Sequence, residues 1–142
     1  MPVYFHSENI SFTLKNKKIT KKWISDIILD SGYTVGDINI IFTSNDYLLE
    51  INRKYLNHNY YTDVITFSYN TEKLISGDIY VSIEQVTLNS RDLGVSSVDE
   101  LNRVIIHGVL HLLGMDDNSD KDRDKMRSSE DRALDKLKLL KN

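Results

Sequence analysis

Residues 107–117 bring two histidines and two aspartates together in the run His107-Gly-Val-Leu-His111-Leu-Leu-Gly114-Met-Asp116-Asp117. Residues four apart on an α-helix share one face, so the imidazoles of His107 and His111 can converge on one ion. Gly114 is expected to end the helix, because glycine readily adopts the left-handed conformation that reverses the chain. The reversal can bring Asp116 or Asp117 back to the histidines. Two histidines, one aspartate and an open fourth position are typical of a catalytic zinc site.

The spacing also leaves three alternatives to such a site open. Peptidases with a His-Glu-x-x-His helix use the glutamate as general base, but this chain has Gly108 there, which argues against peptide hydrolysis. A structural zinc site would normally need a fourth ligand, usually cysteine, and the sequence contains none. The third alternative is a chance pair of histidines on a buried helix, with Gly114 as an ordinary C-cap.

Length and composition are those of one globular domain. The chain has 142 residues, of which 40% are hydrophobic, and it carries a net charge of −3. That charge argues against a protein that coats nucleic acid, although a local groove can still be basic. No apolar run approaches the length of a membrane span, and the N-terminal residues lack the apolar core of a signal peptide. We therefore expect a cytoplasmic protein.

Hydrophobic periodicity and capping residues predict an α+β fold in a single domain. Its sheet is expected to be mixed and mainly antiparallel, with about four strands, and to be covered by helices. A helix opened by a Ser97 and Glu100 capping box would carry both histidines and lie buried at the centre. The predicted strands are 3–5, 10–14, 37–43, 63–69 and 78–83, and the predicted helices are 20–32, 44–56, 84–93, 97–114 and 121 onward.

Three motifs, in this order, resemble the YbeY family. They are Thr-Asp-Val-Ile-Thr-Phe at 62–67, Gly-Asp-Ile-Tyr-Val-Ser at 77–82 and His-Gly-x-Leu-His-Leu-x-Gly at 107–114. The resemblance covers roughly residues 52–130 and implies that 1–142 form a single YbeY-like metallohydrolase domain. It also implies a zinc-dependent, single-strand-specific endoribonuclease that acts in late maturation of the 16S rRNA 3′ end and in ribosome quality control. The nucleophile would be a zinc-bound water.

The same resemblance implies one zinc ion per chain, held by His107, His111 and Asp117. Most members have histidine at the third position, so the aspartate lowers the charge of the loaded site. Iron, nickel and manganese also suit these ligands. The implied partners are single-stranded RNA, 16S rRNA and the small ribosomal subunit, and neither DNA nor a membrane is expected.

The resemblance also implies a positively charged side chain near the cleaved phosphate. Many members have an arginine directly after a tyrosine where this chain has Leu56, and a cation there would stabilise the charge that develops on the phosphoryl oxygens. We predict Arg53, one helical turn earlier, as the catalytic replacement, with His58 as the alternative. The plainer possibilities are a surface arginine and a loop histidine hydrogen-bonded to backbone.

The remaining polar residues of the motifs suit either structural or functional roles. Asp63 and Asp78 are expected to accept backbone hydrogen bonds at turns, although Asp78 could lie behind a zinc histidine. Of the neighbouring Tyr60 and Tyr61, we expect one to stack on an unpaired base and the other to pack.

Three functions remain open at this point. The first is a metal-dependent endoribonuclease, and the second is a metal-dependent hydrolase of another bond, which Gly108 disfavours. The third is a ribosome-assembly binding module with a structural metal, in which Leu56 marks a loss of catalysis.

Overall fold

The fold alternates single strands with helices before a hairpin and three final helices. The computed structural model describes residues 2–142. Its elements, in chain order, are β1 (Val3–Glu8), α1 (Lys17–Asp30), β2 (Thr34–Thr43), α2 (Asn45–Leu56), β3 (Val64–Ser68), β4 (Leu74–Ser82), α3 (Ile83–Leu93), α4 (Ser97–Leu112) and α5 (Asp120–Lys141).

The four strands form one mixed sheet in the order β1-β2-β4-β3. Strand β2 is parallel to both β1 and β4, and only β3 and β4 pair antiparallel. The predicted α+β class and mixed sheet are confirmed, but the expectation of mainly antiparallel pairing was wrong. Helix α1 returns the chain to the starting edge between β1 and β2, which is the crossover that parallel neighbours require.

The second predicted N-terminal strand, 10–14, is a loop instead. The chain turns at Asn9, whose φ of 59° lies in the left-handed region. Ser7 Oγ then donates to the Phe12 carbonyl over 2.6 Å, and the Phe12 ring packs on Phe42 with centroids 4.8 Å apart. The apolar residues of this segment therefore cover the core as a loop and do not extend the sheet.

Most helix ends lie close to their predicted positions. Ser44 caps α2 through its side chain, and Gly94 ends α3 with a φ of 70°. Helix α4 is capped by Ser96, whose Oγ accepts from the Asp99 backbone N–H over 3.0 Å, and not by Ser97. Within residues 2–142, no helix combines the length and the apolar character needed to cross a membrane.

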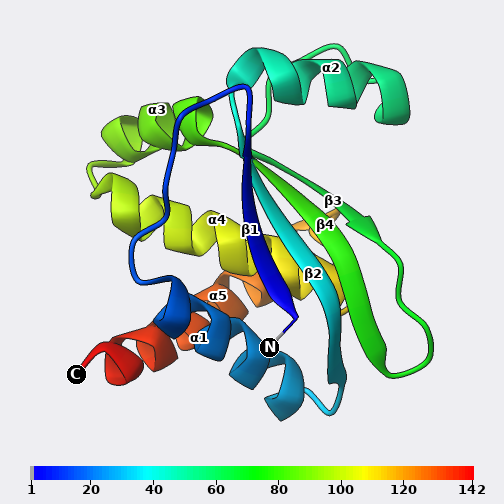
Figure 1. The fold of residues 1–142 in the computed structure, drawn as a ribbon, viewed down its shortest axis with the longest axis vertical. Coiled ribbons are helices and arrows are strands. Elements are labelled where there is room, and N and C mark those ends of the chain that lie inside the picture. The colour runs from blue at the N-terminus through cyan, green and yellow to red at the C-terminus, as the bar shows by residue number, and fades with distance from the viewer. Residues whose placement is uncertain (1) are drawn as a thin grey trace.

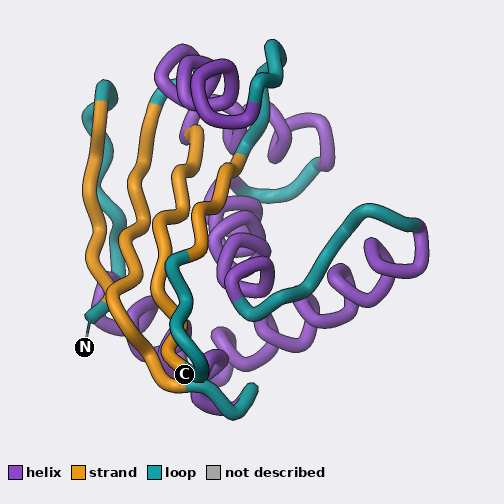
Figure 2. Tube along the Cα trace, turned by 90° about the vertical axis from the view of Figure 1, so that its right-hand side faces the viewer, coloured by secondary structure: helices purple, strands orange, loops and turns teal. Residues whose placement is uncertain are grey.

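Helices α1, α3, α4 and α5 lie on one side of the sheet, while α2 lies beyond one end of the strands (Figures 1 and 2). Helix α4 contacts β3 and β4 and contributes the fully buried Ile105 and Ile106 to the core. Trp23 of α1 is also fully buried, and its Nε1 donates to the Ala133 carbonyl of α5 over 2.7 Å. The expectation that the histidine-bearing helix is central and buried is confirmed.

Candidate metal centre

Gly108 allows helix α4 to pack directly against the sheet. A Cβ atom at this position would lie 2.7 Å from Ile79 Cγ2 and 3.3 Å from Thr66 Cγ2, and the first distance is shorter than a van der Waals contact. A glutamate therefore does not fit where His-Glu-x-x-His peptidases place their general base. The neighbouring His107 and the next-turn His111 stay half-buried, with 22% and 24% of their side chains exposed.

The chain reverses after α4 as the sequence predicts. Gly114 has a φ of 94°, and the Met115 backbone N–H donates to the Leu110 carbonyl over 3.1 Å. This turn brings Asp117 back to the histidines, whereas Asp116 is exposed and outside the cluster. Of the two aspartates left open by the spacing, the geometry selects Asp117.

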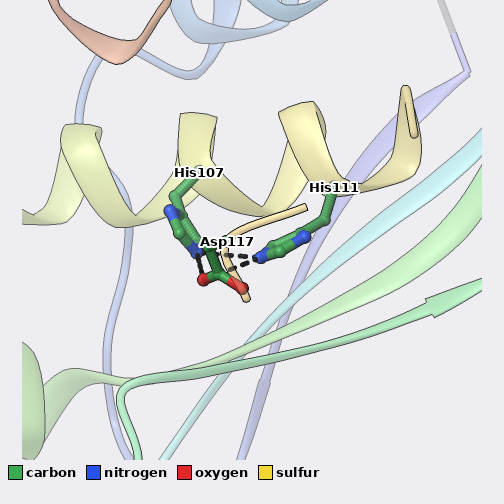
Figure 3. Close-up of side chains that lie close together, drawn as sticks. All are labelled: His107, His111 and Asp117. Carbon is green, nitrogen blue, oxygen red and sulfur yellow. Dashed lines mark hydrogen bonds and ion pairs between the residues drawn. The ribbon is translucent and has the colours of Figure 1, made fainter. Parts of the chain in front are cut away.

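The three side chains converge from α4 and the turn after it (Figure 3). The Nε2 atoms of His107 and His111 lie 3.0 Å apart, and each lies 3.4 Å from Asp117 Oδ2. Ligands of a tetrahedral zinc ion at about 2.0–2.1 Å are separated from one another by roughly 3.3 Å. The spacing of these three atoms therefore fits a single ion of that size.

Hydrogen bonds on the far side of each ring determine which nitrogen carries the proton. His111 Nδ1 lies 2.9 Å from the Met115 carbonyl oxygen, and His107 Nδ1 lies 2.7 Å from Glu130 Oε2. Because a carbonyl and a carboxylate only accept, both Nδ1 atoms donate, and both neutral rings present a lone pair at Nε2. Two lone pairs and the Asp117 carboxylate thus face one point, an arrangement that favours a cation there.

A buried ion-pair network from α5 supports His107. Glu130 is buried, and its second oxygen accepts from Arg103 over 2.9 Å, while Arg103 also binds Asp131 over 2.7 Å. Burial works against the charged form of Glu130, but the hydrogen bonds from His107 and Arg103 outweigh it and lower the pKa of Glu130. Burial also opposes protonation of His107, but Glu130 and Asp117 outweigh it and raise the pKa of His107.

Neither Glu130 nor Arg103 was predicted from the sequence. A signal for Glu130 was present, because it falls on the buried stripe of α5 between Met126 and Ala133. A carboxylate on such a stripe needs a partner inside the protein. Its partner is His107, one of the three residues that could hold a metal ion. Carboxylates that bind the far nitrogen of a metal-ligating histidine orient the ring and raise its basicity.

A pocket of about 340 Å³ opens beside the three side chains. The α2–β3 connection forms its opposite wall, and its lining residues are Asn52, Leu56, His58, Tyr60, Thr62, Asp63, Val64, Ile65, Thr66, His107, His111 and Asp117. Asp63, which we expected only at a turn, is part of this wall. Its side chain accepts from Asn89 over 3.3 Å, and burial raises its pKa.

Asp78 is not at a turn and is not behind a histidine. It lies within β4, where its carboxylate accepts from Asn39 Nδ2 and from the Tyr69 hydroxyl, each over 3.2 Å. Side chains alternate along a strand, and the neighbouring Ile79 is the one that faces α4. Asp78 therefore occupies the opposite sheet face, so both roles predicted for it were wrong.

The structure does not bring Arg53 to the pocket. Its guanidinium pairs with Glu50 over 2.9 Å and donates to Asn59 over 2.5 Å, and it is absent from the described lining. Of the two tyrosines, Tyr60 lines the pocket, whereas the Tyr61 hydroxyl lies 3.4 Å from Asp46.

Comparison with known proteins gives a consistent result. The family model described as Endoribonuclease YbeY matches residues 3–138. A protein named Endoribonuclease YbeY from Flavobacterium psychrophilum is 48% identical over 131 residues, which is 92% of this chain and 91% of that protein. Another of that name, from Azobacteroides pseudotrichonymphae, is 45% identical over 138 residues, with 97% and 99% covered.

A solution structure of a protein from Thermotoga maritima has a related fold. It superposes with a TM-score of 0.67 at 28% sequence identity, and the match covers 95% of this chain and 88% of that one. The family match, the two relatives and this fold agree with the motifs at 62–67, 77–82 and 107–114. The chain belongs to the YbeY endoribonuclease family.

Proposed function

We propose that this protein is a metal-dependent endoribonuclease that cleaves single-stranded RNA at the centre formed by His107, His111 and Asp117. The observation that carries the proposal is the convergence of two imidazole lone pairs and a carboxylate beside an open pocket. Such a set attracts a cation and leaves room for a substrate next to it. The names of the similar proteins support RNA as the substrate.

Zinc is the metal that we propose, at one ion per chain. The Nε2 atoms of both histidines and Asp117 Oδ2 would hold it, and Glu130 and the Met115 carbonyl would keep the two rings in orientation. When bound, zinc supplies a Lewis acid and an acidified water that can attack the phosphorus. The donor set has no thiolate, which agrees with a hydrolytic site rather than a structural one.

The pocket has features that suit a nucleotide. Tyr60 is about half exposed, at 55%, and lies in the wall opposite the histidines, where its ring can stack on an unpaired base. Arg53 lies beyond the pocket and would contact a neighbouring phosphate. We therefore expect a smaller loss of cleavage from Arg53→Ala than from a change in any of the three ligands.

The biological substrate that we propose is 16S rRNA during late 3′-end maturation on the small ribosomal subunit, in the cytoplasm. This part of the proposal rests on the family resemblance. The net charge of −3 gives no general affinity for nucleic acid. Recognition would then depend on the local pocket and on contacts made by the ribosome.

The two alternative functions fit the geometry less well. Hydrolysis of a peptide by the His-Glu-x-x-His route needs a glutamate that cannot fit at Gly108. A structural zinc site is normally closed by four protein ligands, whereas the cluster among the described residues has three. The core of α1, α4, α5 and the sheet forms without them.

Cleavage of a short unstructured RNA by the zinc-loaded protein tests the proposal. We expect cleavage that a chelator abolishes and zinc restores, no cleavage by His107→Ala, and no hydrolysis of casein. Asp116→Ala is the matched control, because Asp116 neighbours the site without joining it. Cleavage of casein but not RNA, or full RNA cleavage by His107→Ala, would contradict the proposal.

A further inference from the structure

No permanently charged cation, lysine or arginine, lies among the described residues that line the pocket beside the candidate metal centre. Cleavage of a phosphodiester builds negative charge on the phosphoryl oxygens, and a positioned hydrogen-bond donor stabilises that charge. Outside the three ligand residues, the lining side chain with a ring N–H to offer is His58.

His58 is held in place by the end of helix α2. The chain takes a left-handed turn at Asn57, with a φ of 56°, and the His58 backbone N–H donates to the Asn52 carbonyl over 3.1 Å. Asn52 is 1% exposed, and its side-chain amide donates to the Tyr60 carbonyl over 2.9 Å. Asn52 therefore holds the segment on both sides of residue 59, through its backbone carbonyl at His58 and its side-chain amide at Tyr60.

Both the ring and the hydroxyl of Tyr60 contact the imidazole of His58. The two rings are stacked, with centroids 5.1 Å apart and planes 19° from parallel, and the Tyr60 hydroxyl lies 2.9 Å from His58 Nδ1. When the phenol donates to Nδ1, the neutral imidazole carries its proton on Nε2. Nε2–H then has no partner among the described residues and is available as a donor.

We propose that His58 donates a hydrogen bond from Nε2 to a phosphate oxygen of the bound RNA, and that Tyr60 is the positioning residue that fixes the required tautomer. The proposal rests on the RNA cleavage proposed above and identifies the group that contacts the phosphate on the wall facing the metal ligands. His58 thereby takes the role predicted from the sequence for Arg53, whose guanidinium pairs with Glu50.

Amide variants of His58 test the position of the donor. The side-chain nitrogen of glutamine can take the place of Nε2, whereas that of asparagine takes the place of Nδ1. We expect His58→Asn to lower kcat/KM for a short unstructured RNA about 10- to 100-fold, as for a lost hydrogen bond to a charged group, while His58→Gln retains most of it. Zinc content and Tm should match the unsubstituted protein in both variants.

The role of Tyr60 is tested by measuring the effect of Tyr60→Phe with and without the His58→Gln substitution. Tyr60→Phe keeps the ring stacked but removes the hydroxyl, so kcat/KM should fall when residue 58 is histidine and should not fall further when it is glutamine. A purely structural role of the hydroxyl would lower activity equally in both backgrounds. Tyr61→Phe is the matched control, because its hydroxyl faces Asp46 and not the pocket.

A gain-of-charge variant provides an independent check. Leu56 lines the same pocket and is 41% exposed, so Leu56→Arg should restore cleavage to a His58→Ala protein. Equal kcat/KM for His58→Asn, His58→Gln and the unsubstituted protein would overturn the role of His58 while leaving the nuclease assignment intact. If the zinc-loaded unsubstituted protein cleaves no RNA, both proposals fail.

Discussion

At the scale of single residues, Asp117 would set the net charge of the proposed zinc site. A zinc ion with three neutral imidazoles carries +2, whereas one carboxylate ligand lowers the total to +1, and a less positive centre acidifies its water less. Asp117 Oδ2 is placed symmetrically, 3.4 Å from each histidine Nε2. This oxygen is therefore placed to bind the same ion as the two histidine nitrogens.

Replacing Asp117 with histidine should consequently change the pH dependence of cleavage. We expect Asp117→His to bind zinc and to move the acidic limb of the pH–rate profile to lower pH, because the site regains one unit of positive charge. The measurement is kcat/KM against pH for both proteins loaded with zinc. Zinc binding with an unchanged profile would show that the charge of the third ligand does not matter.

Glu130 should govern how tightly His107 holds a metal. Glu130→Gln keeps the size of the side chain but removes the negative charge that faces His107 Nδ1, and loss of such a partner typically weakens metal affinity about 10- to 100-fold. Zinc affinity can be measured by competition with a chromophoric chelator. Asp131→Asn is the control, because Asp131 contacts Arg103 but not the histidine. Equal affinities in the three proteins would contradict this role.

The ion pair between Glu130 and His107 should make the stability of the metal-free protein depend on pH. The pKa of Glu130 is lowered from its ordinary 4.5, so the contribution of Glu130 to the free energy of unfolding is present above that pH and is lost as pH falls further. The pKa of His107 is raised from its ordinary 6.5, so the contribution of His107 to the free energy of unfolding is present below that pH and is lost as pH rises through the raised pKa.

The pair should therefore stabilise the chelator-treated protein most between about pH 4.5 and pH 6.5. We expect the free energy of unfolding in urea to have a maximum in this window, and Glu130→Gln to flatten it. A maximum of the same height in Glu130→Gln would mean that other groups cause the pH dependence.

At the scale of elements, the sequence predicts helix ends better than it predicts which strands pair in the sheet. Ser44 and Gly94 mark helix ends through a capping side chain and a left-handed backbone, and the helices predicted at 44–56 and 84–93 begin and end close to them. The parallel pairing of β2 with β4 depends on which distant strands meet, and periodicity does not encode it. Residues 10–14 were misassigned for a related reason, because an apolar loop that covers the core has the composition of a strand.

Helix α4 can present its histidines only because Gly108 lets it approach the sheet. A methyl group there meets the buried Ile79 at 2.7 Å. Overpacking typically costs about 1–3 kcal/mol, and the better helix propensity of alanine returns about 1 kcal/mol. We expect Gly108→Ala to lower the free energy of unfolding by ~1 kcal/mol and also to weaken zinc binding, because α4 must shift.

Chemical denaturation and zinc titration of Gly108→Ala check this expectation. Gly108→Glu, which restores the peptidase pattern, should be destabilised further and should gain no activity on casein. If Gly108→Ala is as stable as the unsubstituted protein and binds zinc equally well, the close approach of α4 to β4 is not required.

At the scale of the whole molecule, the three candidate metal ligands lie outside the hydrophobic core. The ligands come from α4 and the turn before α5, while the sheet, α1 and α5 bury their apolar side chains against α4 independently. Zinc should therefore stabilise the fold only through binding, by about 2.7 kcal/mol when free zinc is 100 times its dissociation constant. A chelator should lower Tm and leave the circular dichroism spectrum intact.

His107→Ala provides the control for this experiment, since its Tm should not respond to zinc or chelator. Unfolding of the unsubstituted protein on chelation would instead indicate a structural metal. That outcome would favour the binding-module alternative.

The sequence indicated the three clustered side chains better than the rest of the candidate site. Helical spacing predicted that His107 and His111 lie together and that the turn brings back Asp116 or Asp117, and the family resemblance pointed to Asp117, which is the aspartate that joins the cluster. Glu130 comes from α5 and the pocket wall from the α2–β3 connection, and their meeting depends on packing between distant elements. Arg53 was chosen by helical spacing alone, which does not reveal its contacts with Glu50 and Asn59.

The most direct measurement is the metal content of the untagged protein by mass spectrometry, beside His107→Ala and Asp117→Ala. We expect about one zinc ion per chain in the unsubstituted protein and its loss from both variants. No bound metal in the unsubstituted protein, or full retention of zinc in both variants, would contradict a metal centre formed by His107, His111 and Asp117.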